Sequence, residues 1–264
     1  MSTPKPQTIT NEISDMVRSL ALNVGTHQRA QERAQPILDE CDKLQRLDVV
    51  SASLLKANVH VLTGNFEQFE YWLKNAAANG ASPADIAKYR LTGYFLSGEI
   101  SKSHALFEDT FRADAGNAIP FLHQAIASGW FHTARNALNS ITPNGAPEAL
   151  LNAVREGADM MDRLNLSEKT TSLILDEAHG LLVSRGLIWL GSCPEISILE
   201  ADQGGPAIYM GFSVMTPPKE AAELGWELSM RLATQDLDTQ GLLISYQGTV
   251  LEAEIDPAHS GVPA

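Results

Sequence analysis

The residues most suggestive of chemistry are the string Asp-Glu-Ala-His at positions 176–179, which follows an apolar run at 173–175. An acidic pair in this setting can hold Mg²⁺ and orient the water that attacks a nucleotide phosphate. That chemistry also needs a glycine-rich loop of the GxxxxGK[ST] type to cradle the phosphates, and the chain contains no such loop. We therefore expect these residues to lie on the charged face of an ordinary helix.

Other groups that could bind a metal or carry out catalysis are dispersed. His104 and Glu108 are one helical turn apart, but a zinc site needs more ligands and their spacing supplies no third one. Glu252, Glu254 and Asp256 alternate along an expected strand, where a solvated edge that resists strand pairing explains them better than a cation site. No nucleophile elbow, zinc-protease or dinucleotide-binding motif is present. The sequence therefore predicts no catalytic residue, no metal and no cofactor.

The helices that must position these residues are indicated by three glycines at the turns between them. These are Gly64, Gly98 and Gly129, which lie 34 and 31 residues apart. Each glycine is the third residue of a similar phrase, namely Leu-Thr-Gly-Asn-Phe, Leu-Ser-Gly-Glu-Ile and Ala-Ser-Gly-Trp-Phe. Two short helices with their turns fill such a period. Apolar residues at helical spacing predict helices at 11–23, 49–62, 66–79, 147–164 and 168–184, among others. The spacing thus predicts an array of helical hairpins.

The hairpins resemble tetratricopeptide repeats. That family places a bulky apolar residue two positions after the turn glycine, a small residue five positions after it and an aromatic nine positions after it. After Gly98 these places hold Ile100, Ser103 and Phe107, and after Gly129 they hold Phe131, Ala134 and Leu138. The resemblance covers residues 15–145 and implies stacked hairpins with a concave surface that holds a partner protein. A generic α-solenoid describes the pattern nearly as well.

The pattern changes after residue 186. Strands are expected at 195–200, 207–216 and 241–246, with a fourth at 249–255, and a helix begins at Thr216-Pro217. Such a small β-β-α-β unit has a marginal core alone, so we expect it to pack on the preceding helices or on a second copy. The predicted fold class is α+β. It comprises a flexible N-terminus at 1–10, a helical-repeat domain at 11–186, a small α/β domain at 187–256 and a flexible tail at 257–264.

Composition and charge limit the partners. The composition is typical of a soluble globular protein, with 44% hydrophobic residues and 19% charged residues. The net charge of −13 is uneven, because residues 1–166 hold 15 Lys and Arg against 18 Asp and Glu, whereas residues 167–264 hold 4 against 14. Such acidity argues against binding nucleic acid, whose phosphates need clustered basic residues, and it permits a basic protein partner.

The expected compartment is the cytoplasm. The N-terminus lacks the pattern of a signal peptide, and no apolar stretch is long enough to cross a membrane, so no membrane partner is expected. Cys41 and Cys193 lack metal-binding or CxxC spacing and are expected to be reduced thiols.

The leading hypothesis for function is a protein–protein interaction module, acting as an adaptor, chaperone or regulatory protein. The residues that we expect to contact the partner are Trp72, Tyr94, His123 and Trp130. A homodimer through the C-terminal unit is a further expectation. The alternative is an enzyme with its site at the junction of the two domains, where pockets tend to form. Its candidate groups are Glu177, His179, Glu195 and Glu200.

Overall fold

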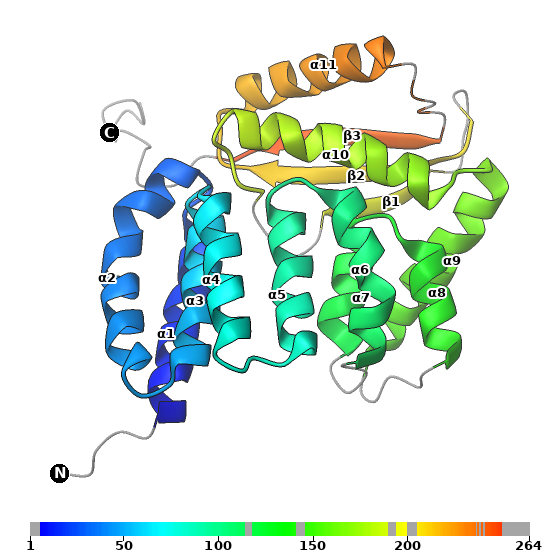
Figure 1. The fold of residues 1–264 in the computed structure, drawn as a ribbon. Helices are drawn as coiled ribbons and strands as arrows, with labels where there is room; N and C mark the ends of the chain where they lie inside the picture. The colour runs from blue at the N-terminus through cyan, green and yellow to red at the C-terminus, as the bar shows by residue number, and fades with distance from the viewer. Residues whose placement is uncertain are drawn as a thin grey trace, which may run out of the picture.

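A computed structural model describes residues 6–113, 118–140, 146–189, 194–199, 205–235, 237, 239 and 241–249 (Figure 1). The fold is α+β, mostly helical with a small three-stranded sheet in the C-terminal third. The helices of the first two-thirds are α1 (Pro6–Asn23), α2 (His27–Gln45), α3 (Val49–Leu62), α4 (Phe66–Ala78), α5 (Pro83–Leu96), α6 (Ile100–Ala113), α7 (Ala118–Ala127), α8 (Phe131–Ser140) and α9 (Glu148–Leu164). The remaining elements are α10 (Glu168–Ser184), β1 (Glu195–Leu199), β2 (Ala207–Val214), α11 (Pro218–Thr234) and β3 (Leu242–Gly248).

Helices α1 to α8 stand side by side, and each packs against the next one along the chain (Figure 1). Helix α3 also packs on α1 and α5, so the odd-numbered helices of the first half contact one another directly. This packing is compatible with a helical repeat. The short helices end where the sequence predicts turns, and the predicted spans 49–62 and 168–184 are confirmed residue for residue.

The turn at each repeat glycine closes the preceding helix in the same way. Gly98 and Gly129 have φ values of +79° and +67°, a region that side chains disfavour. The residue after each glycine then donates its backbone N–H back to the helix, from Glu99 to the Tyr94 carbonyl and from Trp130 to the Ala125 carbonyl, at 2.8 Å in both cases. This six-residue closure is the Schellman motif. The shared phrase in the sequence therefore encodes a shared turn.

The C-terminal unit lies along the edge of the array that carries these turns (Figure 1). Its sheet has the order β1-β2-β3, with β1 antiparallel to β2 and β2 parallel to β3, which α11 connects. Alternate residues of β2 and β3, such as Phe212 and Tyr246, point to the helical side of the sheet. The Tyr246 hydroxyl donates a hydrogen bond of 2.7 Å to the Ala178 carbonyl in α10. The unit packs on the preceding helices, as expected from its small size.

The apolar core consists of two clusters that meet within α5. One cluster is built by α1 to α4 and takes Ile86 from the start of α5 and Ile188 from the residues after α10. The other begins at Leu91 in the same helix and continues through α6 to α11 and all three strands. The predicted domain boundary at residue 186 stays a prediction, but the apolar packing divides about a hundred residues earlier.

Two expectations at the ends of the chain need comment. Helix α1 begins at Pro6, inside the segment expected to be flexible and five residues before the predicted helix start at 11. The flexibility of the N-terminus stays a prediction. The predicted fourth strand and tail lie outside the described residues, except for Thr249, whose N–H donates to the Val214 carbonyl.

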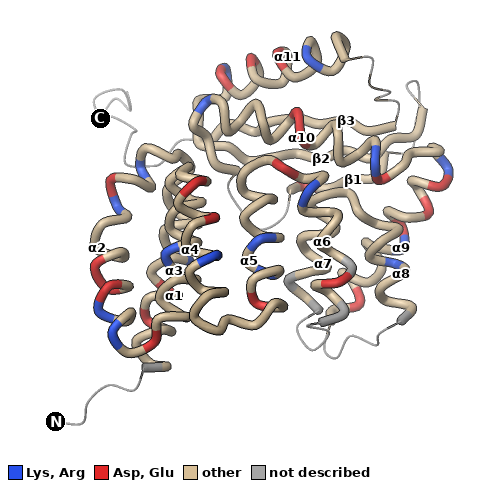
Figure 2. The backbone as a smooth tube through the Cα atoms, viewed as in Figure 1, with Lys and Arg blue, Asp and Glu red and all other residues tan. Residues whose placement is uncertain are grey.

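Figure 2 shows that charged residues are spread over the helices, whereas β2 and β3 carry none.

Candidate functional site

A groove runs along the odd-numbered helices α1, α3 and α5, on one face of the first half of the array. It encloses about 320 Å³, which is within the range of ligand-binding clefts. Its floor is apolar and comes from Val17, Leu55, Val61 and Leu62, which belong to the first core cluster. Its other lining residues are Ser14, Arg18, Ala21, Asn58, Tyr89, Thr92 and Leu96. The groove thus combines a fixed apolar floor with hydroxyl, amide and guanidinium groups.

The chemistry of this groove suits a peptide segment. Apolar side chains of a peptide can enter the cleft while its backbone meets the polar groups along the rim. Arg18 is the basic residue of the lining, and its guanidinium lies 3.6 Å from Asp15, with both side chains largely exposed. Such an exposed pair is weak and can exchange its partners. Arg18 can therefore turn to a ligand in the groove without the loss of a strong ion pair.

Two of the aromatic residues predicted to contact a partner are partly used in packing. Trp72 is half-buried beside α3, and the ammonium group of Lys56 lies 4.1 Å from the centre of its ring. Lys56 is itself buried and pairs with Asp42 at 2.5 Å. Tyr94 is half-buried on α5, and burial together with the charge of Glu70 raises the pKa of its hydroxyl. Neither residue lines the groove.

The other two predicted contact residues lie farther along the chain. His123 is half-buried on α7, away from the groove. Trp130 is fully buried, and its indole N–H donates a hydrogen bond of 3.1 Å to Ser172 in α10. A partner could not reach Trp130 without opening the core, so its expected role as an exposed anchor is wrong. An aromatic residue at helical spacing is usually a core residue, and this one holds α10 on the array.

His179 and Glu195, two of the candidate groups for an enzyme, lie on opposite faces of the sheet. His179 is buried among the rings of Phe95, Trp189 and Phe212, whose centres lie 5.2–5.5 Å from its own. Burial lowers the pKa of His179 to about 4. Glu195 pairs with Gly211 in the sheet, so its side chain projects to the face opposite Phe212. Its carboxylate accepts a hydrogen bond from Gln247 there.

Of the other candidate groups and the cysteines, the structure describes Glu177 and Cys41. Glu177 is half-buried on α10, and Glu200 lies outside the described residues. The thiol of Cys41 is buried, which raises its pKa to about 12 and removes it as a nucleophile at neutral pH. Cys193 lies outside the described residues.

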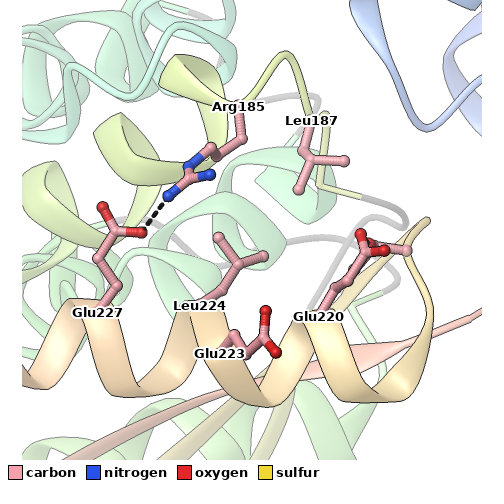
Figure 3. Close-up of a pocket in the computed structure, with 7 residues that line it drawn as sticks. Arg185, Leu187, Glu220, Glu223, Leu224 and Glu227 are labelled. Carbon is pink, nitrogen blue, oxygen red and sulfur yellow. Dashed lines mark hydrogen bonds and ion pairs between the residues drawn. The ribbon is translucent and has the colours of Figure 1, made fainter.

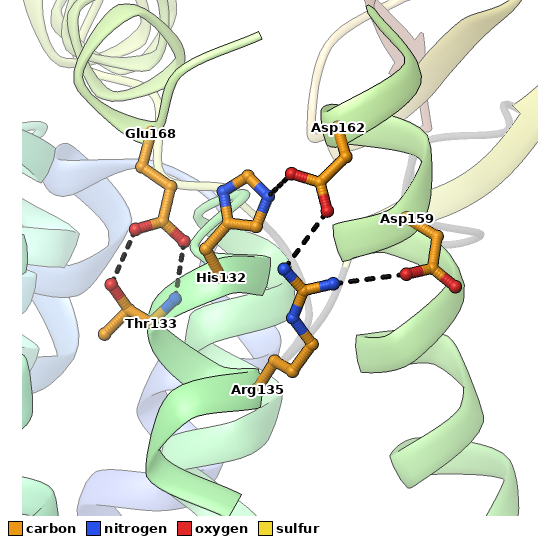
Figure 4. Close-up of polar contacts among 6 residues, drawn as sticks. All are labelled: His132, Thr133, Arg135, Asp159, Asp162 and Glu168. Carbon is orange, nitrogen blue, oxygen red and sulfur yellow. Dashed lines mark hydrogen bonds and ion pairs between the residues drawn. The ribbon is translucent and has the colours of Figure 1, made fainter. Parts of the chain in front are cut away.

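The acidic residues of α10 have a structural use that the sequence analysis missed. Asp176 accepts hydrogen bonds from the backbone N–H of Ser101 at 3.0 Å and from its hydroxyl at 2.5 Å. Glu168 accepts from the N–H of Thr133 at 2.9 Å and from its hydroxyl at 2.6 Å (Figure 4). Ser101 and Thr133 lie in the first turns of α6 and α8, whose N–H groups have no partner within the helix. Helix α10 thus caps two helices of the array from outside.

The spacing along α10 explains how one helix can do this. Eight residues separate Glu168 from Asp176, which is a rise of about 12 Å, and this is close to the separation of packed neighbouring helices. Both carboxylates therefore meet helix starts at the same time. Two acidic residues about two turns apart on one face of α10 were the sequence signal that could have revealed this contact.

A cluster around Glu168 resembles a catalytic triad in composition but not in geometry. Nε2 of His104 lies 3.1 Å from the Thr133 hydroxyl and 3.3 Å from Glu168. In a triad the carboxylate orients the base through its second nitrogen, whereas here both groups share one nitrogen. Burial disfavours ionisation of Glu168, but hydrogen bonds from His104 and Thr133 outweigh it and lower its pKa. The Glu168 contacts therefore fix α10 to α8.

A second set of polar contacts fixes α8 to α9. Arg135 pairs with Asp159 and Asp162, both at 3.1 Å, and His132 lies 2.9 Å from Asp162 (Figure 4). These side chains join neighbouring helices at the surface, where such pairs contribute little individually. Among the described residues, no three His, Cys, Asp or Glu side chains are grouped closely enough to hold a metal ion.

No family model, curated protein or solved structure matches the chain. Within the part of the chain that the structure describes, no helix has the length and apolar character to cross a membrane. The functional inference consequently rests on the geometry of the groove and of the surfaces around it.

Proposed function

We propose that this protein is a protein–protein interaction module of the adaptor, chaperone or regulatory type, built on a tetratricopeptide-like array. The groove along α1, α3 and α5 binds a segment of the partner. The single observation that carries this proposal is the groove itself, with its apolar floor and polar rim on the face formed by the odd-numbered helices. Stacked hairpins commonly use such a face to hold a peptide or a helix.

Two further observations support a binding role. Helix α10 covers the turn edge of the array at Gly98 and Gly129, whereas no described residue covers the groove along α1, α3 and α5. Of the groups expected for catalysis, His179 is buried among apolar rings and Glu195 projects from the opposite face of the sheet. We therefore retain no second candidate function, and the cytoplasmic location stays a prediction.

The proposal is tested with a matched pair of arginine substitutions. Thr92 is exposed on α5 and lines the groove, whereas Ala77 is exposed on α4 and does not. Thr92→Arg places a long charged side chain in the groove, and Ala77→Arg adds the same charge elsewhere. Affinity capture with quantitative mass spectrometry should recover a specific partner with the wild type and with Ala77→Arg, at a level at least tenfold above Thr92→Arg. Equal recovery with all three proteins would contradict the proposal.

A further inference from the structure

The outer face of α11 carries an apolar surface that no described residue covers. Trp226 is 72% exposed and Met230, one turn later, is 52% exposed. Ala222 and Ala233 extend this stripe along the same side of the helix, and both are exposed. The opposite side of α11 is buried through Ala221, Leu224, Leu228 and Leu232. An exposed tryptophan in the middle of an apolar stripe is the kind of group that anchors interfaces.

An acidic cleft borders this stripe on one flank. It encloses about 410 Å³ between α11 and the end of α10 and is lined by Arg185, Leu187, Thr216, Glu220, Glu223, Leu224 and Glu227 (Figure 3). Its three glutamates lie on one side of α11 at helical spacing. The cleft thus joins a negative wall to the apolar ridge of Trp226 and Met230.

The three glutamates of the cleft differ in how closely basic side chains approach them. Glu227 is held by Arg185 at 2.6 Å and by Arg231 at 2.8 Å. Glu223 lies one turn before Trp226 and meets Lys219 only at 3.9 Å, with both side chains mostly exposed. Glu220 accepts a hydrogen bond from the Thr216 hydroxyl, and no basic side chain in the described part of the chain pairs with it. Negative charge therefore remains at the end of the cleft that lies nearest the start of α11.

We propose that α11 and its acidic cleft form a docking surface for a basic amphipathic helix of another protein. Apolar side chains of that helix pack on Trp226 and Met230, while its Lys and Arg side chains reach Glu220 and Glu223. Charge complementarity selects this occupant, because residues 167–264 hold 14 acidic residues against 4 basic ones. A second copy would bring another −13 charge to the surface, and the last residues of the chain add acidic groups but no Lys or Arg. This surface deepens the proposed function by adding a second contact, separate from the groove.

The experiment uses the full chain and a fluorescein-labelled model helix of alternating Leu and Lys pairs. A peptide of identical composition in non-amphipathic order serves as the matched probe. Fluorescence anisotropy should show saturable binding of the amphipathic peptide that is at least tenfold tighter than binding of the reordered one. Trp226→Ala should weaken binding by about thirtyfold, as expected for an interface anchor. Glu223→Gln should weaken it about threefold and reduce its salt dependence.

Control variants and alternative outcomes make the test decisive. Tyr71→Ala and Glu67→Gln change an exposed aromatic and an exposed acid on α4, and both should bind the peptide like the wild type. Equal binding of both peptides, or no effect of Trp226→Ala, would overturn the proposal. A wild-type homodimer that Trp226→Ala dissociates in light scattering would assign the surface to a second copy instead. Thr92→Arg should leave peptide binding unchanged, so failure here is distinguishable from failure of the groove proposal.

Discussion

The first four helices, α1 to α4, and the next four, α5 to α8, differ in what surrounds their turns, although the turns at Gly64, Gly98 and Gly129 share one phrase. In the first half the turn glycine Gly64 faces the ring of His27, a residue of the array itself, whereas Gly25 faces Met215 of the C-terminal unit. The core of these helices takes only Ile188 from the residues that follow α10. In the second half the glycines Gly98 and Gly129 face α10, and the core extends into the sheet. The same turn sequence therefore stays within the array at Gly64 but forms a base for α10 at Gly98 and Gly129.

This difference shows that the glycines of the second half meet two requirements. They permit a positive φ, and they leave room for another helix to approach the backbone. A Cβ atom on Gly98 would lie 3.0 Å from the backbone of His179 and Gly180. A turn requirement is visible in the sequence, whereas a close approach depends on a helix about eighty residues away.

The largest expected effect compares two tryptophans, one from each half. Trp130→Ala should lower the free energy of unfolding by about 4 kcal/mol, because it empties a fully buried site in the second core. Trp72→Ala should cost about 1–2 kcal/mol, because the ring is half-buried and its main polar partner is Lys56. Urea unfolding of both variants measures the difference. Similar losses of unfolding free energy in the two variants would contradict the distinction between a fully buried and a half-buried tryptophan.

The next effect separates the turn requirement from the close approach. Gly98→Ala should cost about 3 kcal/mol, the sum of a disfavoured φ and a clash with the α10 backbone. Gly80 has a φ of +97° with no atom near its missing side chain, so Gly80→Ala should cost about 1 kcal/mol. Denaturant midpoints with unchanged m values give the comparison. Equal destabilisation by the two substitutions would contradict the clash expected between residue 98 and the α10 backbone.

A smaller effect depends on pH and belongs to the second half alone. The buried His179 has a pKa of about 4, whereas an unfolded histidine has a pKa of about 6.5. Between these values the unfolded chain binds a proton that the folded chain does not, so stability falls as the pH is lowered from 6.5 toward 4. His179→Phe removes this contribution and should lose about 2 kcal/mol less than the wild type between pH 7 and pH 4.5. Identical pH profiles would mean that His179 is accessible to protons in the folded chain.

The smallest effect compares two helix caps. Asp48 caps α3 from the adjoining residue, with its carboxylate 2.9 Å from the Ser51 nitrogen, whereas Asp176 caps α6 from another helix. Asp48→Ala and Asp176→Ala should each cost about 1 kcal/mol. Hydrogen exchange should accelerate only at α3 in the first variant, but at both α6 and α10 in the second. Faster exchange confined to α6 in the second variant would show that the contact does not hold α10 in place.

The elements of this fold could largely be predicted from sequence, because their signals are local. Ser82-Pro83 predicts the start of α5, Gly129 predicts the end of α7, and the alternation of apolar residues predicts β2. The site was harder to predict because it depends on which helices become neighbours. Asn58 and Thr92 line one groove although they are 34 residues apart. Trp130 is buried because α10 packs over it, and the sequence around Trp130 does not show which helix will do so.

The central claim is that the open face of α1, α3 and α5 binds the partner, and photo-cross-linking in cells tests it most directly. The full chain carries benzoylphenylalanine in place of Asn58, which lines the groove, or in place of Tyr71, which is exposed on α4 outside it. We expect position 58 to give one discrete cross-linked product, with a yield at least tenfold higher than from position 71. We also expect Thr92→Arg to abolish this product. The same products from both positions, or none from position 58, would contradict the central claim.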